Sequence, residues 1–205
     1  MHDSPLPPAG ALGRYGAGAI ILHWTIALLV AVNIAIGLRM EAQTGLAKFQ
    51  AFQLHKSVGI TVLLLSLARL AWRLTHRPPP LPAHMKPWER RAAGITHWAF
   101  YALLIGLPLT GWIVVSASPF NLPTLLYKVI PWPHIGFIHA LPAGARKSVA
   151  ATFAPTHVVL AWTAITLLIL HIGAALRHQF WTRDGVLWRM APMKLFQPAR
   201  PEPEI

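Results

Sequence analysis

Cysteine is absent from this 205-residue chain, and acidic residues are scarce. Without thiols the protein can form neither a disulfide nor a cysteine-ligated iron–sulfur cluster, and it has no CxxCH motif. Only six Asp and Glu residues are present and none lies in an apolar run, so carboxylate metal sites and paired-carboxylate hydrolysis are disfavoured. Metal chemistry would therefore depend mainly on the eleven histidines.

Charged residues are also few, at 12% of the chain, whereas hydrophobic residues make up 55%. This composition is too apolar for an ordinary soluble domain and predicts an integral membrane protein. The net charge of +12 would suggest nucleic-acid binding in a soluble protein. The basic residues, however, lie at the ends of apolar runs, where they meet lipid headgroups and water. We therefore expect a lipid bilayer, and no nucleic acid, as a partner.

Four apolar stretches are long enough to cross a bilayer, which takes roughly 20 helical residues. Helices are expected because an open strand would leave backbone polar groups unpaired in hydrocarbon. The first stretch is longer than the apolar region of a typical signal peptide and lacks a convincing cleavage site, so it is counted as a span. No internal repeat stands out. The sequence predicts one domain over residues 1–205, an all-α integral membrane four-helix bundle with spans at about 17–38, 57–75, 95–117 and 153–176.

Lys and Arg are distributed unevenly between the two sides of this bundle. Twelve lie on the side of both termini and six lie on the opposite side. Because basic residues are retained on the cytoplasmic side, the N- and C-termini are predicted to be cytoplasmic.

Four histidines lie near the ends of the predicted spans, at two depths. Ionisable residues at membrane depth are costly and usually mark function or pair with a partner. With the predicted orientation, His23 and His171 lie near the cytoplasmic end, and His55 and His157 lie near the outer end. The two histidines of the last span are 14 residues apart, so they project from nearly the same helix face, about 21 Å apart along the axis.

Two imidazole sites on one helix face are what two haems, one in each leaflet, require. A bis-histidine haem takes one imidazole on each side of its ring, so each histidine of the last span needs a partner from another helix. The matching depths predict His23 with His171 and His55 with His157. Zinc is an alternative, although it normally takes three or four ligands at one point. For any one histidine, a hydrogen bond between helices is the simpler interpretation.

Four other residues near the cytoplasmic end are secondary candidates. His97 competes with His23 as a ligand, although a supporting or packing role is favoured. Arg69 and Arg73 share a helix face and are candidates to pair with haem propionates, with snorkelling to lipid phosphates as the alternative. His178 lies two turns beyond His171 and is a candidate for binding a quinone headgroup, with interfacial snorkelling equally open.

Five segments contain these histidines and part of the tail, namely LHWTIALLVAVNIAIG, HKSVGITVLLLSLARLAWRL, HWAFYALLIGLPLTGW, HVVLAWTAITLLILHIGAALRHQF and RDGVLWRMAP. They resemble segments of the bacterial cytochrome b561 family, over all four spans and part of the tail. The resemblance implies a four-helix bundle in the bacterial cytoplasmic (inner) membrane. It also implies two b-type haems ligated by His23, His55, His157 and His171, which exchange electrons with ubiquinone as part of respiratory electron transport.

Some members of that family resemble superoxide oxidases, which take an electron from superoxide at the outer face and pass it to quinone. The resemblance implies the same oxidoreductase activity here, and the basic outer loops would steer an anionic donor. The long outer loop 118–152 matches the family poorly and leaves the donor site open. The alternative function is a cytochrome b membrane-anchor subunit that exchanges electrons with a partner dehydrogenase. A non-haem transporter is disfavoured because paired broken helices are missing.

Overall fold

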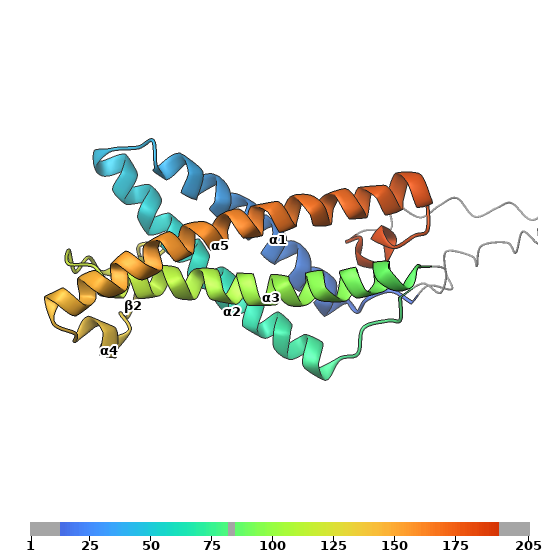
Figure 1. The fold of residues 1–205 in the computed structure, drawn as a ribbon, viewed down its shortest axis with the longest axis horizontal. Helices are drawn as coiled ribbons and strands as arrows, with labels where there is room; N and C mark the ends of the chain where they lie inside the picture. The colour runs from blue at the N-terminus through green and yellow to red at the C-terminus, as the bar shows by residue number, and fades with distance from the viewer. Residues whose placement is uncertain (1–12, 82–84, 193–205) are drawn as a thin grey trace, which may run out of the picture.

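Four long helices dominate the computed structural model, which describes residues 13–81 and 85–192 (Figure 1). Each of the four is long and apolar enough to cross a membrane. The predicted all-α membrane bundle with four spans is thereby confirmed. The helices are α1 (Ala17–Met40), α2 (Gly45–Thr75), α3 (Pro87–Ala117) and α5 (Ala143–Arg177).

Three of these helices begin well before the predicted spans. α2 begins at Gly45 rather than at residue 57, α3 at Pro87 rather than at residue 95, and α5 at Ala143 rather than at residue 153. Hydropathy marks only the part of a helix that matches the hydrocarbon layer, whereas backbone hydrogen bonding continues into the polar region. α3 illustrates this, because Pro87 starts the helix and the Glu89 carboxylate accepts a hydrogen bond from the Lys86 N–H at 3.0 Å.

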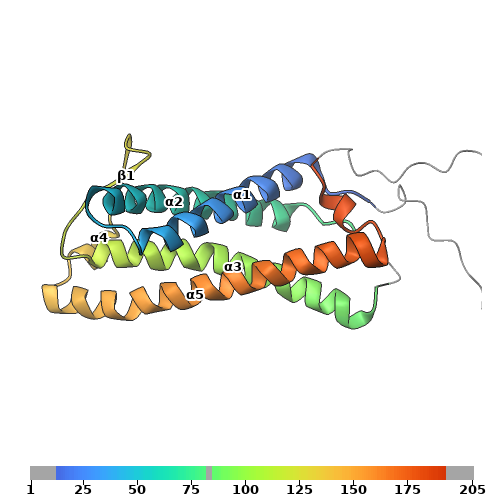
Figure 2. The ribbon, with the colours of Figure 1, turned by 90° about the horizontal axis from the view of Figure 1, so that it is seen from above.

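Two helical hairpins make up the bundle. α1 packs on α2, α3 packs on α5, and α2 also contacts α3. Figure 2 shows the α1–α2 hairpin on one side of the molecule and the α3–α5 pair on the other. Large apolar side chains such as Leu28, Leu64 and Ile169 are exposed on the outside of these helices, as expected for a surface that faces lipid.

Residues 118–142 form a folded outer cap where the sequence predicts only a long loop. The strands β1 (Thr124–Leu126) and β2 (Ile130–Trp132) pair antiparallel, and the short helix α4 (Gly136–His139) follows. The cap is attached to α2 by polar contacts. The Ser57 hydroxyl accepts a hydrogen bond from the Tyr127 N–H at 3.0 Å. These elements are short and are held by contacts distant in sequence, which local patterns do not reveal.

The opposite end of the bundle is closed by the short 3₁₀ helix η2 (Leu187–Met190). Arg189 is only 2% exposed. It donates hydrogen bonds to the carbonyl oxygens of Gly13 at 3.0 Å and Pro80 at 2.8 Å, and its own carbonyl accepts from the Tyr15 N–H at 3.2 Å. The first and last described residues therefore lie at one end, which is named the inner end. That this end faces the cytoplasm stays a prediction.

Replacing Ser57 with alanine should loosen the outer cap. Ser57 is 1% exposed, so the Tyr127 N–H would lose its acceptor in a buried place. An unsatisfied buried donor costs about 1–3 kcal/mol. We expect a lower midpoint of thermal unfolding in detergent and faster amide exchange in the cap.

The matched control is Ser148→Ala, because Ser148 is exposed and its hydroxyl bonds only the Gly144 carbonyl of the same helix. This variant should behave as the wild type. Equal losses from both substitutions would contradict an attachment of the cap through Ser57.

Candidate functional site

His23 of α1 and His171 of α5 face each other near the inner end. Their ring centroids are 6.4 Å apart and their planes are inclined by 69°. α1 and α5 are not among the helix pairs with substantial backbone contact, so the imidazoles reach across the space between the two hairpins. With metal–nitrogen bonds of about 2 Å on each side, two imidazoles on opposite sides of one iron have centroids roughly 6 Å apart. The spacing of this pair fits one iron between the rings.

His55 of α2 and His157 of α5 form a second pair near the outer end, with centroids 6.3 Å apart and planes inclined by 78°. α2 and α5 also lack substantial backbone contact. Nδ1 of His157 lies 3.0 Å from the Leu107 carbonyl oxygen. A carbonyl can only accept, so Nδ1 carries the proton and Nε2 keeps its lone pair. Metal-binding histidines commonly have this arrangement.

Each outer imidazole lies against a glycine of its own hairpin. A Cβ at Gly37 of α1 would lie 3.2 Å from Cε1 of His55, and a Cβ at Gly111 of α3 would lie 3.2 Å from Cε1 of His157. Side chains rarely tolerate so short a contact. The absence of a side chain at the two glycines therefore provides the space that the rings occupy. Sequence reasoning missed both residues, since a glycine in an apolar helix carries no signal until its neighbouring helix is known.

A pocket surrounds the inner pair and is lined by residues of all four long helices and η2. His23, His171, His97, Arg69 and Arg73 all line it. Within residues 13–81 and 85–192, neither arginine has an ion-pair or hydrogen-bond partner. Guanidinium groups are well suited to bind carboxylates, so this pocket fits a flat cofactor that carries propionates. The structure thus brings Arg69 and Arg73 to the inner histidines, and their role stays a prediction.

His97 lies as close to His171 as His23 does, with ring centroids 6.1 Å apart. It belongs to α3, however, which packs directly on α5. His97 therefore approaches His171 from within the same hairpin, a position that suits support better than ligation from the opposite side of a flat ring. In the described part of the chain, no three His, Asp or Glu residues are grouped to hold a metal ion, which disfavours the zinc alternative.

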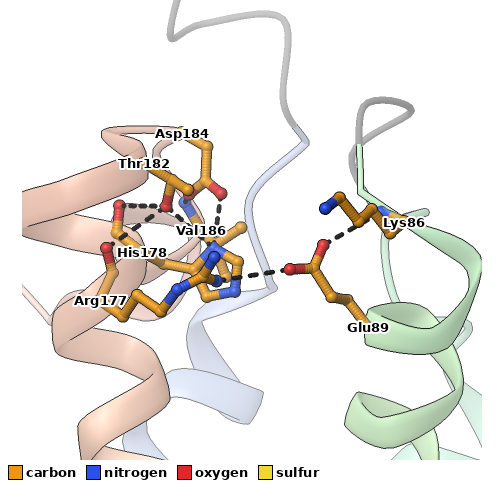
Figure 3. A network of polar contacts seen from close by, with 7 residues as sticks. All are labelled: Lys86, Glu89, Arg177, His178, Thr182, Asp184 and Val186. Atoms are coloured by element: carbon orange, nitrogen blue, oxygen red, sulfur yellow. Dashed lines mark hydrogen bonds and ion pairs between the residues drawn. The ribbon is translucent and has the colours of Figure 1, made fainter.

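His178 lies outside the residues that line the inner pocket and belongs to a polar network at the inner end (Figure 3). Its Nδ1 is 2.5 Å from a carboxylate oxygen of Asp184, and the other oxygen accepts a hydrogen bond from the Val186 N–H at 3.2 Å. Asp184 was not a candidate from sequence, because a single acidic residue in a tail has no informative spacing. A quinone contact at His178 stays a prediction.

A second pocket lies at the outer end and is lined by Lys48, Lys56 and Glu41 among others. The Lys56 side chain is buried, and its Nζ donates a hydrogen bond to the Thr124 hydroxyl of the outer cap at 3.1 Å. This cation is next in sequence to His55. The outer pocket can therefore attract a small anion close to the outer histidine pair.

Two histidines of the outer cap lie apart from both imidazole pairs. His134 and His139 stack on each other, with ring centroids 4.8 Å apart and planes inclined by 9°. Burial lowers the pKa of His134 below its usual value, and the nearby His139 and Lys56 act in the same direction. This shift favours the neutral form of the His134 imidazole.

The chain is similar to known proteins along almost its whole length. The family model of prokaryotic cytochrome b561 matches residues 14–193. Cytochrome b561 homolog 2 of Escherichia coli (strain K12) is 32% identical over 180 residues, which cover 86% of this chain and 90% of that protein. The probable superoxide oxidase CybB of Yersinia pestis is 29% identical over 182 residues, which cover 88% and 97%. Cytochrome b561 homolog 1 of Escherichia coli (strain K12) is 26% identical over 188 residues, which cover 89% and 99%.

Replacing Gly111 with valine should displace the His157 ring, because the new side chain would occupy the space of its Cε1 atom. Overpacking of this kind costs about 1–3 kcal/mol. We expect a lower midpoint of thermal unfolding. Gly106 provides the matched control in the same helix, since a Cβ there meets nothing within 4 Å. If Gly106→Val and Gly111→Val lowered the midpoint equally, the proposed contact with His157 would be wrong.

Proposed function

This chain belongs to the prokaryotic cytochrome b561 family of membrane electron-transfer proteins, and from this premise we propose that it carries electrons across the bacterial inner membrane between an outer donor and ubiquinone. Two b-type haems, when bound, would supply the one-electron chemistry. The observation that supports this proposal most directly is the separation of the rings in the two imidazole pairs, 6.4 Å and 6.3 Å.

The residues of this chain would hold and orient the two cofactors. His23 with His171 would ligate the inner haem, and His55 with His157 would ligate the outer haem. The two histidines of α5 differ by about 21 Å along the helix axis, so the two sites would together cover most of a hydrocarbon core of roughly 30 Å. Arg69 and Arg73 would neutralise propionates at the inner site, which makes burial of those carboxylates less costly.

Superoxide is the outer donor that the outer pocket suits best. One superoxide anion gives up one electron and leaves as dioxygen, so no proton has to be supplied. Lys48 and Lys56 line the pocket and would raise the local concentration of an anion. The similarity to a probable superoxide oxidase supports the same donor. At the inner end ubiquinone would accept two electrons, one from each of two superoxide anions, together with two protons from the adjacent water, with His178 as the candidate contact.

A membrane-anchor subunit that exchanges electrons with a partner dehydrogenase is the second candidate. Such a subunit needs a docking surface, and the outer cap carries exposed apolar side chains, including Phe120, Val129 and Phe137. The two candidates differ in whether the purified chain works alone.

Alanine substitution of the α5 histidines should remove the haems one at a time. His157→Ala should lose or cripple the outer haem and His171→Ala the inner haem, because an iron that loses one imidazole loses most of its binding to the protein. Haem quantification and a reduced-minus-oxidised absorption spectrum of each purified variant would measure this. His139→Ala, in the outer cap, is the control and should keep two haems. A wild type without haem, or loss of both haems from either substitution, would contradict the assignment.

The purified wild type should be reduced by superoxide and then reoxidised by a ubiquinone analogue, without another protein. Lys56→Gln should slow the reduction several-fold and weaken its dependence on salt, because one attracting charge is removed. Lys147→Gln, an exposed lysine at the start of α5, is the control. Stopped-flow absorption would follow both steps. Reduction that requires a second protein would favour the membrane-anchor subunit.

A further inference from the structure

One interval of 14 residues recurs in all four long helices. It corresponds to two heptads, so the two residues that it joins stay on one face of a helix in a left-handed bundle. One residue of each couple lies at the depth of the inner imidazole pair, named the inner level. The other lies at the depth of the outer imidazole pair, named the outer level. The couples are His23 and Gly37 in α1, His55 and Arg69 in α2, His97 and Gly111 in α3, and His157 and His171 in α5.

At the outer level the two hairpins are equivalent. Gly37 lies against His55 in the α1–α2 hairpin just as Gly111 lies against His157 in the α3–α5 hairpin, with the same 3.2 Å between the added Cβ and Cε1. α1 therefore corresponds to α3, and α2 corresponds to α5. The two hairpins therefore share one arrangement at the outer level.

At the inner level the same correspondence breaks down. His23 of α1 corresponds to His97 of α3, and His171 of α5 corresponds to Arg69 of α2. All four side chains line the inner pocket. The outer pair consists of His55 and His157, which occupy corresponding positions in α2 and α5. At the inner level, the position in α2 that corresponds to His171 is occupied by Arg69. Arg69 thus occupies the position, level with the inner imidazole pair, at which a hairpin that matched α3–α5 would carry a histidine.

In the described part of the chain, no side chain compensates the guanidinium charge of Arg69 at this level. It lies close enough to His23 and to His171 to act on both electrostatically. In the described ranges it has no ion-pair or hydrogen-bond partner, and no acidic side chain lines the pocket. Reduction of a ferric haem lowers the charge of the iron by one, so a fixed cation beside its ligands favours the reduced state.

We propose that Arg69 is the residue that raises the reduction potential of the inner haem and so draws electrons from the outer to the inner site. This inference rests on the proposed function. Arg73, one turn further toward the inner end, lines the same pocket but is not level with the ligands. Lys56 is the cation that follows the outer ligand His55 in sequence, and its Nζ donates a hydrogen bond to the Thr124 hydroxyl of the outer cap.

The test is a spectroelectrochemical titration of the purified full-length protein with both haems bound. Arg69→Gln should shift the midpoint of the inner haem to lower potential and leave the outer midpoint unchanged, while Arg69→Lys should keep most of the wild-type value. His171→Ala identifies which of the two transitions belongs to the inner haem. Haem content and the reduced absorption spectrum of Arg69→Gln are measured alongside, and the inner midpoint is read from the protein that retains both haems, which separates a change of charge from loss of the cofactor.

Arg73→Gln is the matched control and should shift the inner midpoint less than Arg69→Gln does. An unchanged inner midpoint in Arg69→Gln, equal shifts of both haems, or a larger shift in Arg73→Gln would overturn the inference. Any of these results in a protein with two haems would leave the proposed function standing. A wild type that binds no haem would instead remove the proposed function itself.

Discussion

Pairs of imidazoles that span the space between two helical hairpins are the constraint on which the rest of this structure depends. α5 carries one member of each pair, and α1 and α2 carry the others. Because α5 makes little backbone contact with α1 or α2, the hairpins must be held at a set distance by something other than direct packing. The contact between α2 and α3, together with the closures at both ends, fulfils this role and leaves room for flat cofactors between the layers.

In lipid the hydrophobic effect contributes little to helix packing. An apolar side chain that moves from lipid into the bundle gains little free energy, because both surroundings are apolar. Close packing and polar contacts must hold the helices instead. Gly18 of α1, where a Cβ would lie 2.8 Å from the Trp72 ring of α2, lets one hairpin close tightly. Hydrogen bonds then attach the outer cap to α2, and η2 to Tyr15 just before α1. The middle of the bundle is shaped by small residues and its ends by polar ones.

The features that could be predicted from the sequence are those with a large energetic cost. Apolar runs of membrane length are costly in water and histidines are costly at membrane depth, so the four spans and His23, His55, His157 and His171 stood out in the sequence. Helix starts such as that of α2 could not be predicted, since hydropathy gives no signal where a helix continues beyond the hydrocarbon layer. The outer cap, Asp184 and the two glycines beside the outer rings depend on contacts between distant segments. The likeness of the two hairpins could not be seen in the sequence either. Lipid-facing positions accept many apolar side chains, so their residues need not match.

The closure at the inner end has a consequence for biogenesis. Tyr15 precedes the first span and Met190 follows the last, yet both line the inner pocket, and the backbone hydrogen bond between Tyr15 and Arg189 joins these two parts of the chain. Helices enter the bilayer in the order of their synthesis, so this wall of the pocket cannot exist while the ribosome is still translating the fourth span. The outer imidazoles can meet once α5 is inserted, whereas the inner pocket is complete only after residue 190 has emerged and folded back. The residues of the outer site are therefore all synthesised before the wall of the inner pocket is complete.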